Sequence, residues 1–277
     1  MTAATPMADR VGHRPPGHYR WPGVLRSEWT KFTSVRSTTW SLLATVVLTI
    51  AIGILATAVE AQRWNQLSFV ERLTFDPVRQ SLTGILFSQL AIGVLGVLVV
   101  SAEYGTGTIR STLAAVPNRP LVLGAKAAVF GVVALVVSEA LSFAAFGIGQ
   151  AILSGSTPTT SLSNPGALRA VVGAGLYLTL LGLFALGLAA IIRHTAGAIS
   201  AFVGVLLVLP LIVQALPQSI IDDVGKFLPA NIGVTMVGLR TPIGIDSFSP
   251  WAGLGLLALY AAAALVLGGW TMVRRDA

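Results

Sequence analysis

Long apolar runs alternate with short polar segments along this chain, and within the runs the apolar positions do not alternate with polar ones. A helix needs about 20 apolar residues to cross roughly 30 Å of hydrocarbon. Because the runs are continuous, they predict helices rather than the strands of a membrane barrel. We therefore expect an all-α, polytopic membrane protein with six transmembrane helices, at residues 40–59, 82–101, 121–152, 168–192, 196–216 and 251–273.

Composition agrees with lipid as the solvent of this fold. Hydrophobic residues make up 54% of the 277 positions and charged residues only 10%, against about 25% charged residues in soluble domains. The formal net charge is +7, and the basic residues lie mostly in the segments between the apolar runs and do not cluster on one soluble face. This distribution predicts membrane lipid as a partner and no nucleic acid. The chain has no cysteine, which excludes thiolate metal sites and thiol catalysis.

The distribution of charge predicts the orientation of the six spans. The side that holds both termini carries twelve Lys and Arg against four acidic residues, and the other side carries six of each. The positive-inside rule places the more basic side, and with it both termini, in the cytoplasm. Lys126, near the start of the third span, is expected to snorkel to the lipid headgroups.

The remaining segments complete the predicted organisation. Residues 1–22 are polar and read as a disordered cytoplasmic tail with no cleavable signal peptide. Residues 23–39 form an amphipathic interfacial helix before the transmembrane domain, residues 40–277. On the outer side, residues 60–81 are expected to include a short interfacial helix, and residues 217–250 a short outer helix or re-entrant piece.

A polar segment between the second and third spans is the first candidate functional site. It runs from Glu103 and Tyr104 to Pro120 and predicts a small helix exposed on the cytoplasmic side. Its apolar stripe consists of Ile109, Leu113 and Val116, whereas Arg110 lies off that stripe. We expect Thr106 or Thr108 to cap its start. A plain surface loop is the alternative interpretation.

The second candidate precedes the first span. Leu25, Trp29 and Phe32 share one helical face that Lys31 avoids. A basic amphipathic helix with aromatic residues on its apolar side is typical of a membrane surface. Glu28 lies near the edge of this stripe and is expected to pair with Lys31.

The third candidate is Glu139, inside the third span. A carboxylate at membrane depth is costly and is by default a candidate functional group. Gln150 lies eleven residues later, close to the same helical face. A buried Glu that hydrogen-bonds to a neighbouring helix is the favoured interpretation, since no second acid or His within a span offers a proton relay.

Catalytic motifs are missing. The chain contains no Gly-x-x-x-x-Gly-Lys-Ser/Thr phosphate loop, no His-Glu-x-x-His and no Gly-x-Ser-x-Gly. We therefore expect a non-catalytic subunit that binds no cofactor directly. ATP hydrolysis, if it drives this protein, must belong to another chain.

Three segments resemble permease subunits of ABC-2 type transporters. They are Leu25–Lys31 (Leu-Arg-Ser-Glu-Trp-Thr-Lys), Glu103–Arg110 (Glu-Tyr-Gly-Thr-Gly-Thr-Ile-Arg) and Leu228–Asn231 (Leu-Pro-Ala-Asn). The resemblance runs from about Leu25 to the C-terminus, and its second motif is the most specific.

The resemblance implies a permease that pairs with a second permease subunit, as a homodimer or heterodimer, and binds cytoplasmic ABC ATPase subunits that carry ATP and Mg. It implies a connecting helix at residues 24–38 with Glu28, Trp29, Lys31 and Phe32. It also implies a coupling helix at residues 105–117. The expected contacts with the ATPase are Glu103, Tyr104, Thr106, Thr108, Ile109, Arg110 and Leu113, with Ile109 and Leu113 seated against either the ATPase or the bundle.

The expected function is thus the membrane subunit of an ATP-driven exporter in the cell membrane of a bacterium, with apolar or amphipathic cargo. The alternative from the residues alone is an ATP-independent ion-coupled carrier or channel that uses Glu139. A membrane scaffold or immunity subunit without transport is the third possibility.

Overall fold

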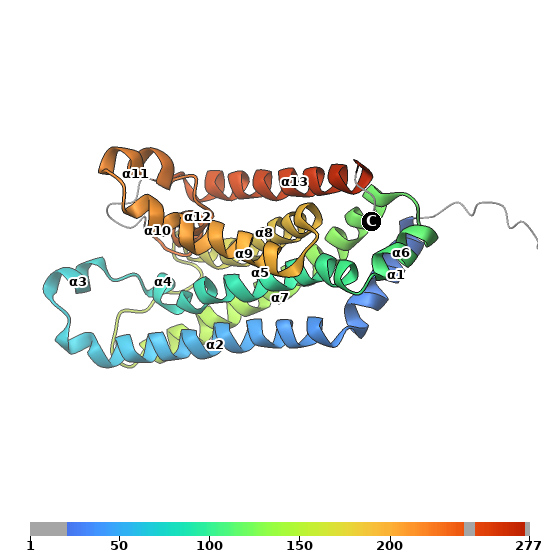
Figure 1. Cartoon of the computed structure of the whole chain (residues 1–277). Helices are drawn as coiled ribbons and strands as arrows, with labels where there is room; N and C mark the ends of the chain where they lie inside the picture. Colours follow the sequence, from blue (N-terminus) through green and yellow to red (C-terminus); the bar gives the residue numbers. More distant parts are fainter. Residues whose placement is uncertain (1–20, 241–246, 275–277) are drawn as a thin grey trace, which may run out of the picture.

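The computed structural model describes residues 21–240 and 247–274, and these residues form helices and connecting loops with no strand among them (Figure 1). Six helical stretches are long and apolar enough to cross a membrane, so the all-α, six-helix prediction is confirmed. They are Thr38–Gln66, Thr83–Gly105, Arg119–Leu153, Ala167–Ile192, Thr195–Gln214 and Pro250–Arg274.

The bundle is elongated, with short helices at both ends (Figure 1). The long helices are α2 (Arg36–Arg63), α5 (Thr83–Gly105), α7 (Arg119–Leu153), α8 (Ala167–Ile192) and α13 (Pro250–Arg274). The fifth span is built from α9 (Thr195–Val203), a π-helical turn (Gly204–Val208) and α10 (Leu209–Gln214). The shorter helices are α1 (Trp21–Ser34), α3 (Phe69–Thr74), α4 (Pro77–Ser81), α6 (Thr108–Ala115), α11 (Gln218–Gly225) and α12 (Pro229–Met236).

Helix α8 forms the centre of the bundle. It packs against α5, α7 and α13, and α2 packs on the far side of α5 and α7. Glycines permit these close contacts, because a Cβ added at Gly96 of α5 would collide with the carbonyl of Gly182 on α8. Small residues at helix crossings are how membrane helices approach without a hydrophobic driving force between them.

Polar contacts tie the outer helices to the bundle. The Asp76 carboxylate accepts a hydrogen bond from the Leu239 backbone N–H at 2.6 Å, and Arg169 donates to the Gly238 carbonyl at 2.7 Å. The expectation of helix within residues 60–81 is confirmed by α3 and α4. Residues 217–250 hold two short helices, α11 and α12, and their portion 241–246 lies outside the described residues.

At the opposite end, α1 begins at Trp21 and ends at Ser34, and α2 begins at Arg36. The interfacial helix is therefore shorter than the predicted 23–39, because the extended backbone of Val35 (φ −84°, ψ 116°) separates it from the first span. Of the predicted tail, residues 1–20 lie outside the described residues.

Candidate functional site

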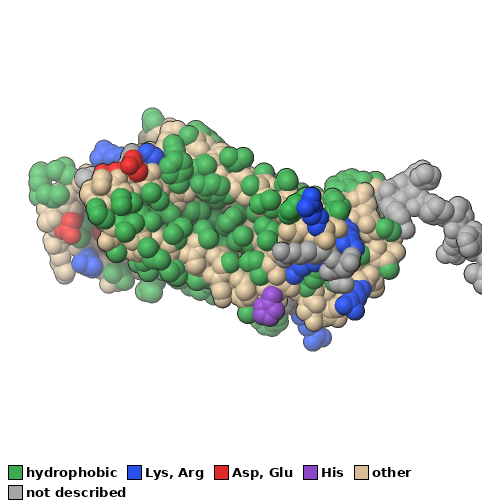
Figure 2. All heavy atoms as spheres, turned by 45° about the horizontal axis from the view of Figure 1, so that its top comes forward, with side chains coloured by type: hydrophobic (Ala, Val, Ile, Leu, Met, Phe, Trp, Pro, Cys, Tyr) green, Lys and Arg blue, Asp and Glu red, His purple; other side chains and the backbone are tan. Residues whose placement is uncertain are grey.

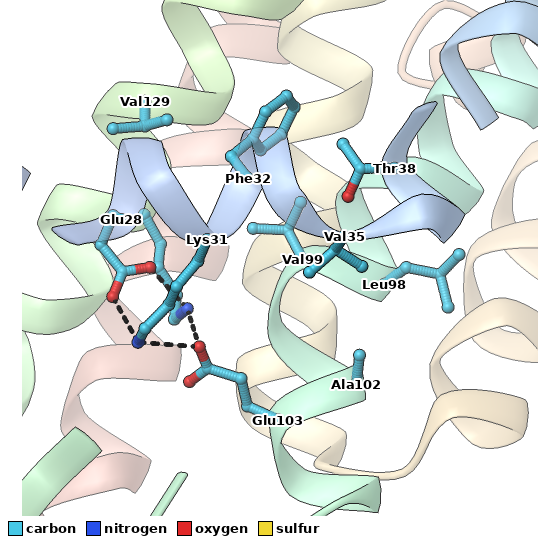
Figure 3. A pocket seen from close by; sticks show the side chains of 11 residues that line it. Glu28, Lys31, Phe32, Val35, Thr38, Leu98, Val99, Ala102, Glu103 and Val129 are labelled. Atoms are coloured by element: carbon cyan, nitrogen blue, oxygen red, sulfur yellow. Dashed lines mark hydrogen bonds and ion pairs between the residues drawn. The ribbon is translucent and has the colours of Figure 1, made fainter. Parts of the chain in front are cut away.

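Four charged side chains close a ring beneath α1, which we call the charge ring: Glu28, Lys31, Glu103 and Lys126 (Figure 3). The Lys126 ammonium lies 2.7 Å from one carboxylate oxygen of Glu28 and 2.7 Å from Glu103 Oε1. The Lys31 ammonium lies 2.9 Å from the other oxygen of Glu28 and 3.0 Å from Glu103 Oε1. Positive and negative groups therefore alternate around the ring.

The ring joins three helices and touches a fourth. Glu28 and Lys31 come from α1, Glu103 from the last turn of α5, and Lys126 from the third turn of α7. Lys31 also donates to the Thr112 hydroxyl of α6 at 3.0 Å. The ring thus fixes α1 against the two spans that flank α6.

Most of the ring is withdrawn from solvent. Lys126 and Glu28 are 4% and 5% exposed, and Glu103 is 14% exposed. Buried charges persist only when they are paired and hydrogen-bonded, and here each ammonium meets two carboxylates. Glu103 Oε2 is buried with no hydrogen-bond partner in the described part of the chain.

Lys31 lies at the solvent edge of the ring, with 35% of its side chain exposed. Burial lowers the pKa of its ammonium, but the hydrogen bond and charge of Glu28, together with those of Glu103, outweigh burial and raise the pKa above its ordinary value. The ring therefore holds Lys31 in its charged form.

Lys126 does not snorkel to the headgroups, so that expectation is wrong. Its side chain turns inward because two buried carboxylates, Glu28 and Glu103, offer it stronger partners than the interface does. This pairing joins positions 98 residues apart, and no local sequence pattern reports it.

Helix α6 begins without a side-chain cap. The residue before it is Gly107, with a left-handed backbone (φ 73°), and Thr108 is the first helical residue. The expected cap by Thr106 or Thr108 is wrong, because the Thr106 hydroxyl instead donates to the Ala102 carbonyl of α5 at 2.8 Å. A residue without a Cβ adopts the left-handed turn at no steric cost.

The two faces of α6 differ in what they contact. Ile109 is 3% exposed and Leu113 packs against the same core. These two residues therefore face the bundle, which is one of the two seats expected for them, and their contact with a partner stays a prediction. Arg110 is exposed, as are Thr106 and Thr108.

Tyr104 contacts both the hydrophobic core and Arg193, which follows α8. Its half-buried ring packs against the core, and the guanidinium of Arg193 lies 5.4 Å from the ring centroid. The fourth and fifth spans are joined by a tight turn, since α8 ends at Ile192, Arg193 has φ 60° and α9 begins at Thr195.

The buried face of α1 is centred on Glu28. Val24, Glu28 and Phe32 are buried, whereas Trp29 is 50% exposed. The predicted stripe of Leu25, Trp29 and Phe32 is therefore rotated by about one residue. The expected Glu28–Lys31 pair is confirmed, but Glu28 lies inside the buried face instead of at its edge.

The two intramembrane polar groups are not brought together. Glu139 lies against Gly175 of α8, and its Oε2 is buried with no hydrogen-bond partner in the described residues. Gln150 is near the end of α7 far from the charge ring, where its amide donates to the Pro77 carbonyl at 3.0 Å and to the Ser81 hydroxyl at 2.9 Å. Gln150 therefore ties α7 to α4.

An open groove of about 380 Å³ separates α1 from α6, next to the ring. Its lining includes Ser27 and Lys31 from α1 and Ser111 from α6. Within residues 21–240 and 247–274, no group of three or more His, Asp or Glu could hold a metal ion. The charge ring and the groove beside it connect α1, α5, α6 and α7 mechanically.

Comparison with known proteins gives no assignment. No protein-family model matches the chain, and no curated protein matches it. The six apolar helices are those of a multi-pass membrane protein.

Proposed function

We propose that this chain is the permease subunit of an ATP-driven exporter of the ABC-2 type. The observation that carries the proposal is the charge ring, which connects the surface helix α1 to the two spans on either side of α6. The motif Glu103–Arg110 adds to it, because the resemblance assigns a coupling helix to this segment. In the proposal the chain pairs with a second permease subunit, identical or different, and binds separate cytoplasmic ATPases.

The exposed face of α6 is the proposed contact with the ATPase. Arg110 and Ser111 lie on this face, and Thr112 at its edge is held by Lys31. Displacement of α6 would reach α5 directly and α7 through the ring, because buried ion pairs resist separation. The two spans would then move together and change access along the bundle. An apolar or amphipathic cargo fits the apolar composition of the helices.

The test is a charge reversal on α6. Full-length protein is co-expressed with the ABC ATPase encoded nearest to its gene, purified in lipid nanodiscs and assayed for bound ATPase. Arg110→Glu is expected to weaken the complex at least about tenfold, since charges at an interface rim set complementarity. Arg63→Glu makes the same change at an exposed position at the opposite end of the molecule and serves as the control.

The proposal fails if the wild-type protein co-purifies with no ATPase, or if both reversals have the same effect. Leu113 is unsuitable for this test, because its side chain packs against the core and its replacement would disturb folding.

A second candidate function is an ATP-independent, ion-coupled carrier that uses Glu139. The buried, unpartnered Oε2 of this side chain favours it, since an intramembrane carboxylate often marks an ion path. In this case transport survives removal of every ATPase and is abolished by Glu139→Gln. In the exporter, Glu139→Gln leaves ATP-dependent transport largely intact.

A further inference from the structure

A second groove lies between α7 and α13, near the end of the molecule that carries α1 and α6. It has a volume of about 440 Å³. Its lining is apolar or glycine throughout: Pro120, Leu123, Gly124, Ala127, Leu265, Val266, Gly269, Trp270 and Val273. The walls are helix faces, because the α13 positions recur at intervals of three and four residues.

The floor of the groove is made by glycine. A Cβ added at Gly269 would meet only Leu123 Cδ2, at 3.8 Å, and one added at Gly124 would meet the Trp21 ring at 3.4 Å. Both distances are compatible with van der Waals contact, so the space above Gly269 accepts additional carbon atoms. Val266 and Trp270 on the outer wall are 70% and 52% exposed.

The length of the groove matches one leaflet of a bilayer. Leu265 and Val273 are eight residues apart, which at 1.5 Å per residue is about 12 Å along the helix axis. Half of a hydrocarbon core that is about 30 Å thick is about 15 Å. The groove is therefore nearly as long as a single leaflet is deep.

Two arginines, Arg119 and Arg274, directly adjoin in sequence the lining residues Pro120 and Val273. The Arg274 guanidinium lies 4.3 Å from the Trp270 ring centroid, and Arg119 donates to the Met272 carbonyl at 2.5 Å. Figure 2, with the α13 side of Figure 1 turned forward, shows Lys and Arg side chains at this end beyond a largely hydrophobic surface. Guanidinium groups bind phosphate in a bidentate manner.

We infer that this groove binds one acyl chain of an anionic phospholipid, with the lipid phosphate beside Arg274 and Arg119. An apolar slot one leaflet deep fits an acyl chain, and the arginines select a negative headgroup. Basic sites at the cytoplasmic ends of membrane helices bind anionic lipids for the same reason. The inference rests on the membrane placement of α7 and α13 and does not depend on the exporter proposal.

The experiment is native mass spectrometry of the full-length protein in detergent, titrated with palmitoyl-oleoyl phosphatidylglycerol or with the corresponding phosphatidylcholine. Wild-type protein is expected to retain one phosphatidylglycerol with at least about fivefold preference over phosphatidylcholine, because each basic residue at a membrane surface contributes about that factor. Arg274→Gln is expected to remove most of this preference while leaving the groove open.

Gly269→Leu fills the groove and is expected to abolish retention of both lipids. Gly255→Leu is its matched control, since Gly255 lies near the other end of α13 and an added Cβ there has nothing within 4 Å. Equal retention of the two lipids by wild-type protein, or unchanged binding in Gly269→Leu, overturns the inference. A dimer that becomes monomeric in Gly269→Leu but not in Gly255→Leu also overturns it, because the groove would then hold a second copy.

Discussion

Lys126 is the residue on which the charge ring depends most. It is 4% exposed and lies 2.7 Å from both carboxylates, so it offsets two negative charges that are largely withdrawn from water. Lys31 contacts the same carboxylates from a more exposed position. Removal of Lys126 leaves Glu28 and Glu103 with a single shared cation.

We predict that Lys126→Met lowers the free energy of unfolding by about 3 kcal/mol, near the lower end of the cost of breaking a buried ion pair, because Lys31 remains. The double variant Glu28→Gln with Lys126→Met should lose clearly less, since it leaves no uncompensated buried carboxylate at Glu28. Reversible unfolding in sodium dodecyl sulfate measures both. Arg26 lies on the exposed face of α1. Arg26→Met is therefore the control, because it removes a cation near the ring without breaking a buried ion pair. A double variant as unstable as the single one would contradict this account of the ring.

The raised pKa of Lys31 predicts a response to alkaline pH. Because the folded pKa lies above the ordinary value of 10.5, the contribution of protonated Lys31 is fully present below pH 10.5. It is lost as pH rises through the folded pKa. A spin label on Arg26→Cys should therefore show α1 loosening only above about pH 10.5, and the absence of native cysteine keeps the label specific.

Lys31→Met in the labelled protein separates this titration from others. The variant should lose the alkaline step attributed to Lys31 and show a looser α1 already at neutral pH. An unchanged alkaline step in this variant, or loosening of the parent protein between pH 7 and pH 9, would contradict the assignment.

At the scale of elements, the six spans could be predicted because each apolar run is a local property of the sequence. The helical nature of α1 and α6 was also predictable. Which face of α1 is buried was harder to predict. Any analysis of apolar periodicity treats Glu28 as a polar position, and yet it lies at the centre of the buried face. Only the presence of a lysine from another helix makes that burial possible.

The start of α6 shows a different limit. Thr106 and Thr108 are good capping residues, but α5 ends at Gly105 and α6 begins at Thr108, so the chain turns within these few residues. The turn requires a left-handed residue at Gly107, and the Thr106 side chain bonds back to the helix it follows. Whether a threonine here caps α6 or bonds back to α5 depends on the path of the backbone between the two helices. The local sequence does not determine that path.

At the scale of the whole molecule, the segregation of charge predicts the orientation. Within the face that it displays, Figure 2 shows Asp and Glu side chains at one end only, together with some Lys and Arg, and Lys and Arg without acidic side chains at the other end. Single cysteines test the prediction: Ser219→Cys on α11 should react with a membrane-impermeant maleimide in intact cells, and Ser111→Cys on α6 only after lysis. Both serines are exposed, so access through the membrane is the difference measured. Labelling of Ser111→Cys in intact cells would contradict the predicted orientation and indicate the opposite one.

The pairings that assemble the bundle could not be predicted from the sequence. Glu28 and Lys126 lie 98 positions apart, and Arg169 meets the carbonyl of Gly238 across 69 positions. Charge balance gives one signal: two acids and two lysines lie near helix ends on the same predicted side of the membrane. That signal limits the possible partners but does not choose among them.

The length of α7 has a mechanical consequence. This single helix of 35 residues carries Lys126 at one end and Gln150 at the other, 24 residues and about 36 Å apart. A rotation of α7 as one body by about 5° about the ring would displace its Gln150 end by about 3 Å over that length. Gln150 is bonded to Pro77 and Ser81, so such a rotation would become a translation of α4 at the other end of the bundle.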